Sequence, residues 1–351
     1  MKFGCFVKIF MASKLSYYYE MCGQAHSWRV IPKLWNYTKY RFLKRQAVTS
    51  VRRYAPQIAS LLLTMRCNLN CGYCNAAKIL KEGREKGQEN DANLEKVKRI
   101  FATPLFARCL LVDLLGGEPL LVMDLDKIVA YLAGRGHITN TSTNGLLLAQ
   151  RIADLKRAGI SRINVSLYGA NRSVLERDLP AINKTFPVHM SMVLLRSEVE
   201  NHPEKLVETA RFVHDAGCRI LRFWIYRPMG VDPRPEEIIN DSSPAYIEFC
   251  RKVDKALPSF CLWPSAAQTG KVKKLCPQLW QRVGCDMAGN MAICCGTDTM
   301  LPKPNNNLFD GEPDVIFNHP LLVKMREQLM DPVCPPPEVC RGCNLLGETG
   351  W

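Results

Sequence analysis

Residues 58–74 read IASLLLTMRCNLNCGYC and join an apolar run to three closely spaced cysteines. The run Ile58–Thr64 has the length and composition of a buried strand. Cys67, Cys71 and Cys74 follow it in the spacing C-x3-C-x2-C. Three thiolates fill three iron sites of a [4Fe–4S] cube and leave the fourth iron without a protein ligand. Because an open metal position can bind and change a small molecule, this stretch predicts a reactive cluster directly after a buried strand.

Short apolar runs and longer helical segments alternate over the next 160 or so residues, as in repeated βα units. This alternation predicts a parallel sheet with right-handed crossovers, hence an α/β fold with a partial (β/α)6 TIM-like barrel. The expected strands are Ile58–Thr64, Leu110–Leu115, Ile138–Thr143, Arg162–Leu167, Val188–Leu194 and Ile220–Tyr226. The expected helices are Asn93–Ala102, Asp124–Gly134, Ala149–Ala158, Arg172–Ala181 and Pro203–Ala216.

Polar or glycine-rich segments follow the first four expected strands. They are the cysteine stretch, Gly116–Pro119, Ser142–Gly145 and Ser166–Gly169. Because the carboxyl ends of parallel strands share one rim of a barrel, these four segments are expected to meet there. That rim is the predicted active face.

The cysteine content points to metal rather than to disulfides. The chain of 351 residues holds 16 cysteines and has an apolar fraction of 47%, which is ordinary for a globular protein. Disulfide frameworks are typical of short secreted domains. The N-terminal apolar stretch is interrupted by Lys8 and Lys14, unlike a secretory signal or a membrane span. We therefore expect a cytoplasmic protein with reduced, metal-binding cysteines.

Residues 1–53 are basic and aromatic. They hold eleven Lys or Arg and one acid, Glu20, and so carry +10 of the net charge of +14. Two interpretations stay open: a helical extension that packs its aromatics on the main domain, and peripheral contact with an anionic membrane, which would make the protein membrane-associated. Binding of nucleic acid is disfavoured as the role of this segment.

Three domains are expected from these patterns. Residues 1–54 form the basic aromatic extension, 55–260 the partial barrel, and 261–351 a cysteine-rich domain that begins where the βα rhythm stops.

The cysteine triplet followed by Gly116-Gly117-Glu118-Pro119 resembles the radical S-adenosylmethionine (SAM) enzymes over residues 56–226. A zinc knuckle or a ferredoxin-like site would explain the cysteines alone, but not the glycine segment beside them. The resemblance implies that Cys67, Cys71 and Cys74 hold a [4Fe–4S] cluster and that SAM binds the fourth iron.

The resemblance also implies a set of SAM contacts. Two glycines allow close approach of the backbone, and a carboxylate accepts hydrogen bonds from an ammonium, which suits the methionine amino group. Polar groups at the strand ends match regions that hold the ribose and carboxylate of SAM. The implied cofactor-binding residues are Tyr73 at the adenine, then Gly116, Gly117, Glu118, Ser142, Asn144, Ser166 and Arg177. Several relatives that carry the arginine have Asp at the position of Tyr168 here.

The C-terminal cysteines resemble the SPASM domain and its shorter twitch form, which enclose an auxiliary [4Fe–4S] cluster. Gly289-Asn290 would form a hairpin turn, and Phe317–Leu329 the usual helix. The implied ligands are Cys276, Cys294, Cys340 and Cys343. One auxiliary cluster is favoured over two, with Cys285, Cys295 and Cys334 left over. A Zn(Cys)4 ribbon is the alternative.

Reductive cleavage of SAM and removal of a substrate hydrogen are the implied oxidoreductase chemistry, fed by a one-electron donor such as flavodoxin or ferredoxin. Three functions stay open: oxidation of a ribosomal peptide or protein side chain, tailoring of a small molecule such as a sugar, aminocyclitol or nucleotide, and a non-enzymatic iron–sulfur or zinc protein. The final Gly347–Trp351 lacks a double-glycine tail, which disfavours cyclisation of GTP. No catalytic acid or base is assigned.

Overall fold

The computed structural model describes the chain from residue 27, with interruptions. The described residues are 27–43, 49–52, 54–72, 74, 76–85, 91–228, 233–240, 242–264, 276–294, 299–341, 343 and 346. The predicted adenine contact Tyr73, the left-over Cys295 and most of the basic extension lie outside them.

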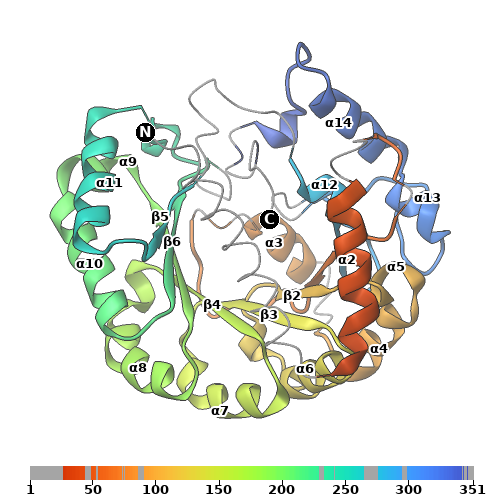
Figure 1. The fold of residues 1–351 in the computed structure, drawn as a ribbon, viewed down its shortest axis with the longest axis horizontal. Helices are drawn as coiled ribbons and strands as arrows, with labels where there is room; N and C mark the ends of the chain where they lie inside the picture. Colours follow the sequence, from red (N-terminus) through yellow and green to blue (C-terminus); the bar gives the residue numbers. More distant parts are fainter. Residues whose placement is uncertain are drawn as a thin grey trace.

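The described chain is built around one parallel sheet of eight strands in the order β7-β6-β5-β4-β3-β2-β1-β8 (Figure 1). Its two edge strands, β7 and β8, are not paired with each other, so the barrel is open. The partial barrel predicted from the sequence is confirmed. The strands are β1 Ile58–Leu62, β2 Leu111–Leu115, β3 Ile138–Thr143, β4 Arg162–Leu167, β5 His189–Leu194, β6 Ile220–Ile225, β7 Cys261–Leu262 and β8 Arg282–Asp286.

Helices cover the outer face of the sheet in an arc (Figure 1). Alternate strand residues, such as Val112 and Leu114 of β2, are buried beneath them. The α-helices are α2 Ile31–Leu43, α3 Ala77–Glu85, α4 Leu94–Ala102, α5 Pro104–Ala107, α6 Leu125–Gly134, α7 Leu148–Ala158, α8 Arg172–Thr185, α9 Arg196–Asn201, α10 Pro203–Asp215, α11 Pro244–Ala256, α12 Gln278–Gln281, α13 Pro313–Phe317 and α14 Pro320–Met330. The short 3-10 helices are η1 Trp28–Val30, η2 Pro119–Leu121, η3 Gly169–Asn171, η4 Pro235–Glu237 and η5 Glu338–Cys340.

The sheet has eight strands where the sequence pattern predicts six, and its last two strands, β7 and β8, lie beyond the predicted domain boundary at residue 260. β8 pairs with β1 in parallel, with Ile58 opposite Arg282 and Leu62 opposite Asp286. Arg282 also forms an ion pair with Asp113 of β2, and its Nη1 donates to the Ser60 hydroxyl at 2.6 Å. The first part of the predicted C-terminal domain is therefore an edge of the barrel sheet.

A tight turn follows β8, as the sequence predicts. Gly289 has φ +86°, a conformation that favours glycine. The Asp286 carboxylate accepts hydrogen bonds from the backbone N–H groups of Ala288 and Asn290 at 2.9 Å. The turn returns the chain along β8, with Met291 opposite Cys285.

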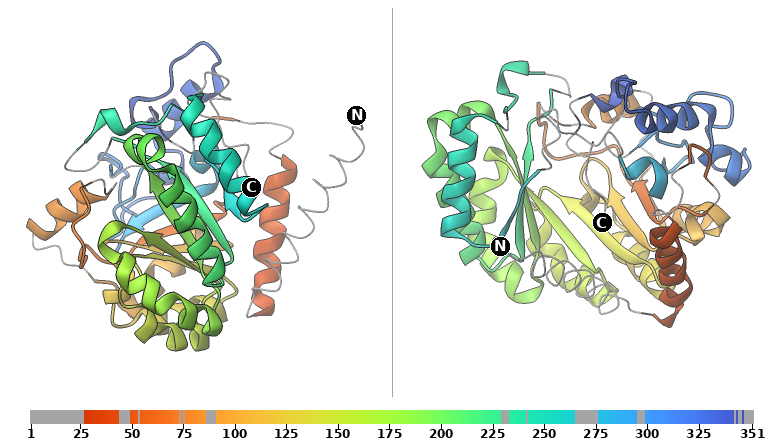
Figure 2. Two further views of the ribbon diagram at one scale, coloured as in Figure 1. Left: turned by 90° about the vertical axis from the view of Figure 1, so that its left-hand side faces the viewer. Right: turned by 45° about the horizontal axis from the view of Figure 1, so that its top comes forward.

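Helix α2 lies at the periphery of the molecule, at the end of the barrel where the strands begin (Figure 2). Val30 and Tyr37 pack on Leu110, just before β2, and on Ile138, the first residue of β3. This confirms in part the interpretation that the extension packs its aromatics on the main domain. No helix in the described part of the chain is long and apolar enough to span a membrane.

Candidate functional site

The cysteine loop follows β1 and faces a cavity of about 440 Å³ at the carboxyl ends of the strands. Cys67, Cys71 and Cys74 all line that cavity. The backbone folds tightly here: the N–H of Cys74 donates to the carbonyl of Cys71 at 3.1 Å, and the N–H of Leu69 donates to the Cys67 sulfur at 3.4 Å. The structure thus brings the three predicted cluster ligands to one surface.

The surroundings of Cys71 disfavour its thiolate form. Burial, followed by the nearby Cys74 and Cys67, raises the pKa of Cys71 to about 11. Thiolates so close together need cations between them, and bound metal ions lower the pKa of their thiol ligands. The donor set therefore fits iron. Within the described residues no three metal-binding side chains converge on the position of a single ion, while the ligands of a cubane bind separate irons.

The glycine segment lies against the start of the cysteine loop. The N–H of Gly117 donates to the carbonyl of Thr64 at 2.9 Å, and that of Glu118 to the carbonyl of Arg66 at 2.8 Å. A Cβ on Gly117 would lie 2.1 Å from the Arg66 carbonyl oxygen, so no larger residue fits. Both Gly116 and Gly117 line the cavity. Without side chains, they present only backbone to a bound ligand.

Glu118 is placed differently from the expectation for its side chain. Its residue is 1% exposed and lies outside the cavity lining. The carboxylate accepts hydrogen bonds from the Thr143 hydroxyl at 2.7 Å, the Asn144 N–H at 2.8 Å and the Leu120 N–H at 3.0 Å. Glu118 therefore ties the loop after β2 to the end of β3. The contact of Gly116, Gly117 and Glu118 with the methionine amino group stays a prediction.

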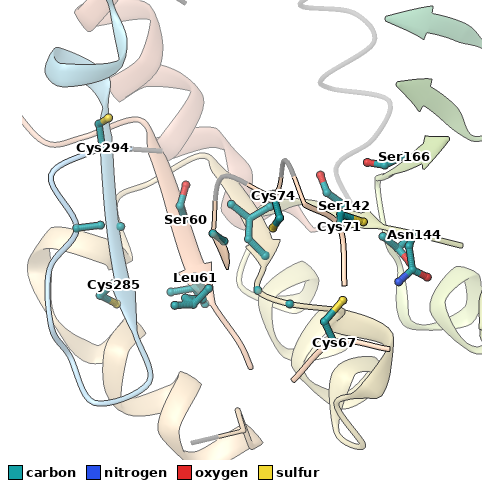
Figure 3. A pocket seen from close by; sticks show the side chains of 18 of the residues that line it. Ser60, Leu61, Cys67, Cys71, Cys74, Ser142, Asn144, Ser166, Cys285 and Cys294 are labelled. Carbon is teal, nitrogen blue, oxygen red and sulfur yellow. The ribbon is translucent and has the colours of Figure 1, made fainter. Parts of the chain in front are cut away.

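The strand-end polar groups lie where the sequence predicts them. Ser142, Asn144 and Ser166 all line the cavity, beside the cysteine loop (Figure 3). The Asn144 side chain donates to the Oδ1 of Asn68, which lies between the first two cysteines, at 2.7 Å. This bond joins the cysteine loop to the end of β3.

Asn171 is a rim residue that sequence reasoning missed. It is fully buried, and its Nδ2 donates to the carbonyls of Asn144 at 2.6 Å and Ser166 at 2.7 Å. Its Oδ1 accepts from the N–H of Tyr168 at 2.7 Å. The only sequence signal is its position five residues after Ser166 in the segment SLYGAN. Asn171 holds the ends of β3 and β4 in register.

Arg177 does not reach the site. Its side chain is 72% exposed on α8 and forms an ion pair with the neighbouring Asp178. Tyr168 lines the cavity instead, and burial raises the pKa of its phenol to about 12. The predicted SAM carboxylate contact through Arg177 is therefore not supported by its position, and a neutral phenol lies at the rim.

The C-terminal segment forms the other side of the cavity (Figure 3). Cys285 on β8 and Cys294 after the turn both line it, together with the apolar Val283, Ile293 and Met300. A predicted auxiliary ligand, Cys294, thus shares one cavity with the three cysteines of the β1 loop.

The other three predicted auxiliary ligands do not line this cavity. Cys340 and Cys343 lie in one turn, where the N–H of Cys343 donates to the carbonyl of Cys340 at 3.2 Å. Cys276 is buried just before α12. The ligand set Cys276, Cys294, Cys340 and Cys343 stays a prediction. The Arg227 guanidinium at the end of β6 donates to the Val339 carbonyl at 2.6 Å, which links this turn to the barrel.

Comparisons with known proteins agree with this geometry. The family model for the radical SAM superfamily matches residues 61–239, just over half of the chain. Among solved structures, Streptococcus suis SuiB bound to its precursor peptide SuiA superposes with a TM-score of 0.61 at 14% identity, covering 82% of this chain and 76% of SuiB. That likeness concerns the fold.

Several curated relatives are GTP 3′,8-cyclases. A probable one from Aeropyrum pernix is 32% identical over 43% of this chain and 46% of its own length. Those of Mycobacterium ulcerans and Acidothermus cellulolyticus are 43% and 32% identical, over 32% and 48% of this chain and 31% and 50% of their own lengths. The chain spans about half or less of the length of these relatives. The chain belongs to the radical SAM superfamily, whose cofactors are the [4Fe–4S] cluster and SAM that the cysteine loop and the glycine segment predict.

Proposed function

We propose that this protein removes a hydrogen atom from an organic substrate bound in the cavity between the cysteine loop and the C-terminal segment. One observation carries the proposal: Cys67, Cys71, Cys74, Gly116 and Gly117 line the same cavity at the carboxyl ends of the strands. When bound, a cluster on three cysteines supplies the electron that cleaves SAM reductively to methionine and a 5′-deoxyadenosyl radical.

The residues of the chain position the reactants and exclude water. Cys67, Cys71 and Cys74 would hold the cluster, and the backbone of Gly116 and Gly117 would face the methionine end of SAM. Leu61, Leu115 and Val193 contribute apolar walls, which keep water away from a radical that would react with almost any C–H bond. Ser142, Asn144 and Ser166 supply hydrogen-bonding groups to the same cavity.

An auxiliary cluster is the natural role for Cys294. Because Cys294 lines the cavity, a cluster held by it with Cys276, Cys340 and Cys343 would border the substrate and could accept an electron. An acceptor at that position supports an oxidation, in which the substrate loses a second electron after the hydrogen atom has left.

A peptide or protein side chain is the first candidate substrate. The edge strands β7 and β8 do not pair, so the open barrel leaves a side on which an extended chain could lie while one side chain enters the cavity. The fold of SuiB, a protein solved with a precursor peptide, is compatible with such an arrangement.

A nucleotide is the second candidate. Identities of 32–43% to GTP 3′,8-cyclases over 32–48% of this chain favour it. A cavity of about 440 Å³ is also in the range of small-molecule sites. The sequence expectation disfavours GTP cyclisation, whereas these identities favour it.

Iron analysis tests the proposal first. Anaerobically purified wild type is expected to hold about eight irons, and the variant Cys67→Ala/Cys71→Ala/Cys74→Ala about four, since each cubane contains four. Cys250→Ala, at a half-buried cysteine on α11, is the control and keeps all of the iron. Zinc in place of iron, or a reconstituted protein that leaves SAM intact under dithionite, would contradict the proposal.

A second experiment separates the substrates. The reconstituted enzyme with SAM and a flavodoxin or ferredoxin reductant is incubated with GTP, or with peptides encoded by short neighbouring reading frames. Formation of 5′-deoxyadenosine above the substrate-free rate, with a matching mass change in one compound, identifies the class. Stimulation by GTP alone would overturn the peptide assignment.

A further inference from the structure

The segment formed by η1 and helix α2 carries two apolar faces, and one of them packs on the barrel. Val30, Leu34 and Tyr37 face the barrel, where they contact Leu110 and Ile138. The other face presents Trp28, Ile31 and Trp35, which are 75%, 63% and 73% exposed. Their spacing of three and four residues places them in one row. We call Trp28, Ile31 and Trp35 the tryptophan face.

The tryptophan face is held rigidly by close contacts below it. Gly136, with φ +79°, lies so near the backbone of Arg29 and Val30 that an added Cβ would be 2.3 Å from the Arg29 carbonyl carbon. The Asn36 side chain donates to the Gln57 Oε1 at 3.4 Å and to the Arg108 carbonyl at 3.5 Å. These contacts seat the inner face of α2 on the barrel and leave the tryptophan face on the outer side.

The surroundings of the tryptophan face are basic. Arg29 and Lys39 are exposed beside it, with the Arg29 guanidinium 5.9 Å from the centre of the Trp28 ring. Helix α2 contains no acidic residue. Residues 1–53 as a whole carry eleven basic residues against one acid. The described basic residues Arg29 and Lys39 would thus attract an anionic surface that meets the tryptophan face.

We propose that the tryptophan face binds the surface of an anionic lipid bilayer. Tryptophan prefers the interface between headgroups and acyl chains, and basic residues add attraction to anionic lipids. A second copy of the chain is a poorer occupant, because a symmetric contact would bring two sets of positive charges together. Since α2 packs where the strands begin and the cavity opens where they end, bilayer contact leaves the cavity free for a water-borne substrate.

Vesicle binding of the full-length protein tests this proposal independently of catalysis. The protein should sediment with vesicles of phosphatidylcholine and phosphatidylglycerol, and much less with phosphatidylcholine alone. Trp28→Ala/Trp35→Ala should lower the partition coefficient by about tenfold or more. The control Met123→Ala/Val333→Ala, which removes two equally exposed apolar side chains elsewhere, should leave it unchanged. Both double variants should keep the wild-type melting temperature and 5′-deoxyadenosine formation.

Four results would overturn it. The first is equal sedimentation with both vesicle types or with neither. The second is vesicle binding that survives in Trp28→Ala/Trp35→Ala, or that falls equally in the control. The third is a concentration-dependent dimer in solution that this variant abolishes, which would assign the tryptophan face to a second copy. Displacement from vesicles by a short DNA duplex, with tighter binding to the duplex, would assign it to nucleic acid.

Discussion

Thr143 donates its hydroxyl hydrogen to the carboxylate of Glu118 over 2.7 Å, and this bond joins the loop after β2 to the end of β3. Burial raises the pKa of Glu118, while hydrogen bonds from Thr143, Asn144 and Leu120 oppose that rise. Burial of this carboxylate is therefore unfavourable, and the three hydrogen-bond donors offset part of that cost. These hydrogen bonds make the Glu118 side chain a support between the loop after β2 and the end of β3, outside the lining of the cavity.

Replacing Glu118 tests this support role. Glu118→Ala leaves three buried donors without an acceptor and should lower the free energy of unfolding by about 3 kcal/mol. Glu118→Gln keeps one acceptor oxygen but places its NH2 group against the Asn144 N–H, so two donors face each other. It should lower the free energy of unfolding by about 1–2 kcal/mol. Urea unfolding measures both. A variant with unchanged stability and lost SAM binding would show instead that the carboxylate acts on the ligand.

Gly117→Ala should remove cofactor binding. Its Cβ would overlap the Arg66 carbonyl, so the backbone leading into Cys67 must shift, at a cost of about 2 kcal/mol or more. The matched control is Gly169→Ala at the end of β4, where a Cβ meets nothing within 4 Å. SAM affinity by equilibrium dialysis and melting temperature are the measurements. Normal SAM binding by a folded Gly117→Ala protein would contradict the close packing.

Replacement by alanine should affect stability and SAM binding strongly at Asn171 and little at Arg177. Asn171→Ala removes hydrogen bonds to both Asn144 and Ser166, which should destabilise the fold by about 2–4 kcal/mol and weaken SAM binding. Arg177→Ala removes an exposed ion pair and should change stability by less than about 1 kcal/mol. Loss of SAM binding in Arg177→Ala at normal stability would return this arginine to the site.

His137 should make the protein sensitive to acid. Burial, followed by the nearby Lys33, lowers the pKa of His137 from 6.5 to about 3, and its Nδ1 lies 2.8 Å from the Cys109 carbonyl oxygen, to which it must donate. Between pH 6.5 and about pH 3, His137 is therefore protonated in the unfolded chain and neutral in the folded protein. Stability is complete above pH 6.5 and falls as the pH drops.

The expected loss from His137 between pH 7.5 and pH 5 is about 2 kcal/mol in the free energy of unfolding. Urea unfolding of wild type and His137→Gln at both pH values gives the difference in slope. His214→Gln, which changes an exposed histidine on α10, controls for the number of histidines. Equal pH slopes for wild type and His137→Gln would refute the assignment.

Much of the barrel could be predicted from the sequence because short β-rich segments alternate regularly with longer helical segments. The predicted bounds of β3 and β4 match those observed, and Gly159 ends α7 with φ +88° as the segment Lys156–Gly159 indicates. The three cysteines and two glycines were placed at one rim by the rule for parallel strands alone.

The remaining features depend on contacts that no local pattern contains. β8 is short, holds Gly284 and begins with a charged residue, and it is a strand because β1 offers an unpaired edge. Arg177 matches the position of an arginine in related enzymes, but it lies on the side of α8 that faces solvent. Asn171 is essential to the rim through bonds to residues up to 27 positions away. The apolar residues of this helical segment point in two directions, so its sequence shows no single apolar stripe. The tryptophan face can be recognised only once the structure shows which residues pack on the barrel.

The pairing of β1 with β8 fixes the order in which the molecule can be completed during synthesis. Ile58 leaves the ribosome more than two hundred residues before its partner Arg282, so this edge of β1 stays open until β8 has been made. Contacts between such distant residues form late and slow folding. The wall that carries Cys294 is thus added last, and we expect delivery of iron and sulfur to the β1 cysteines to be easiest before that wall closes over them.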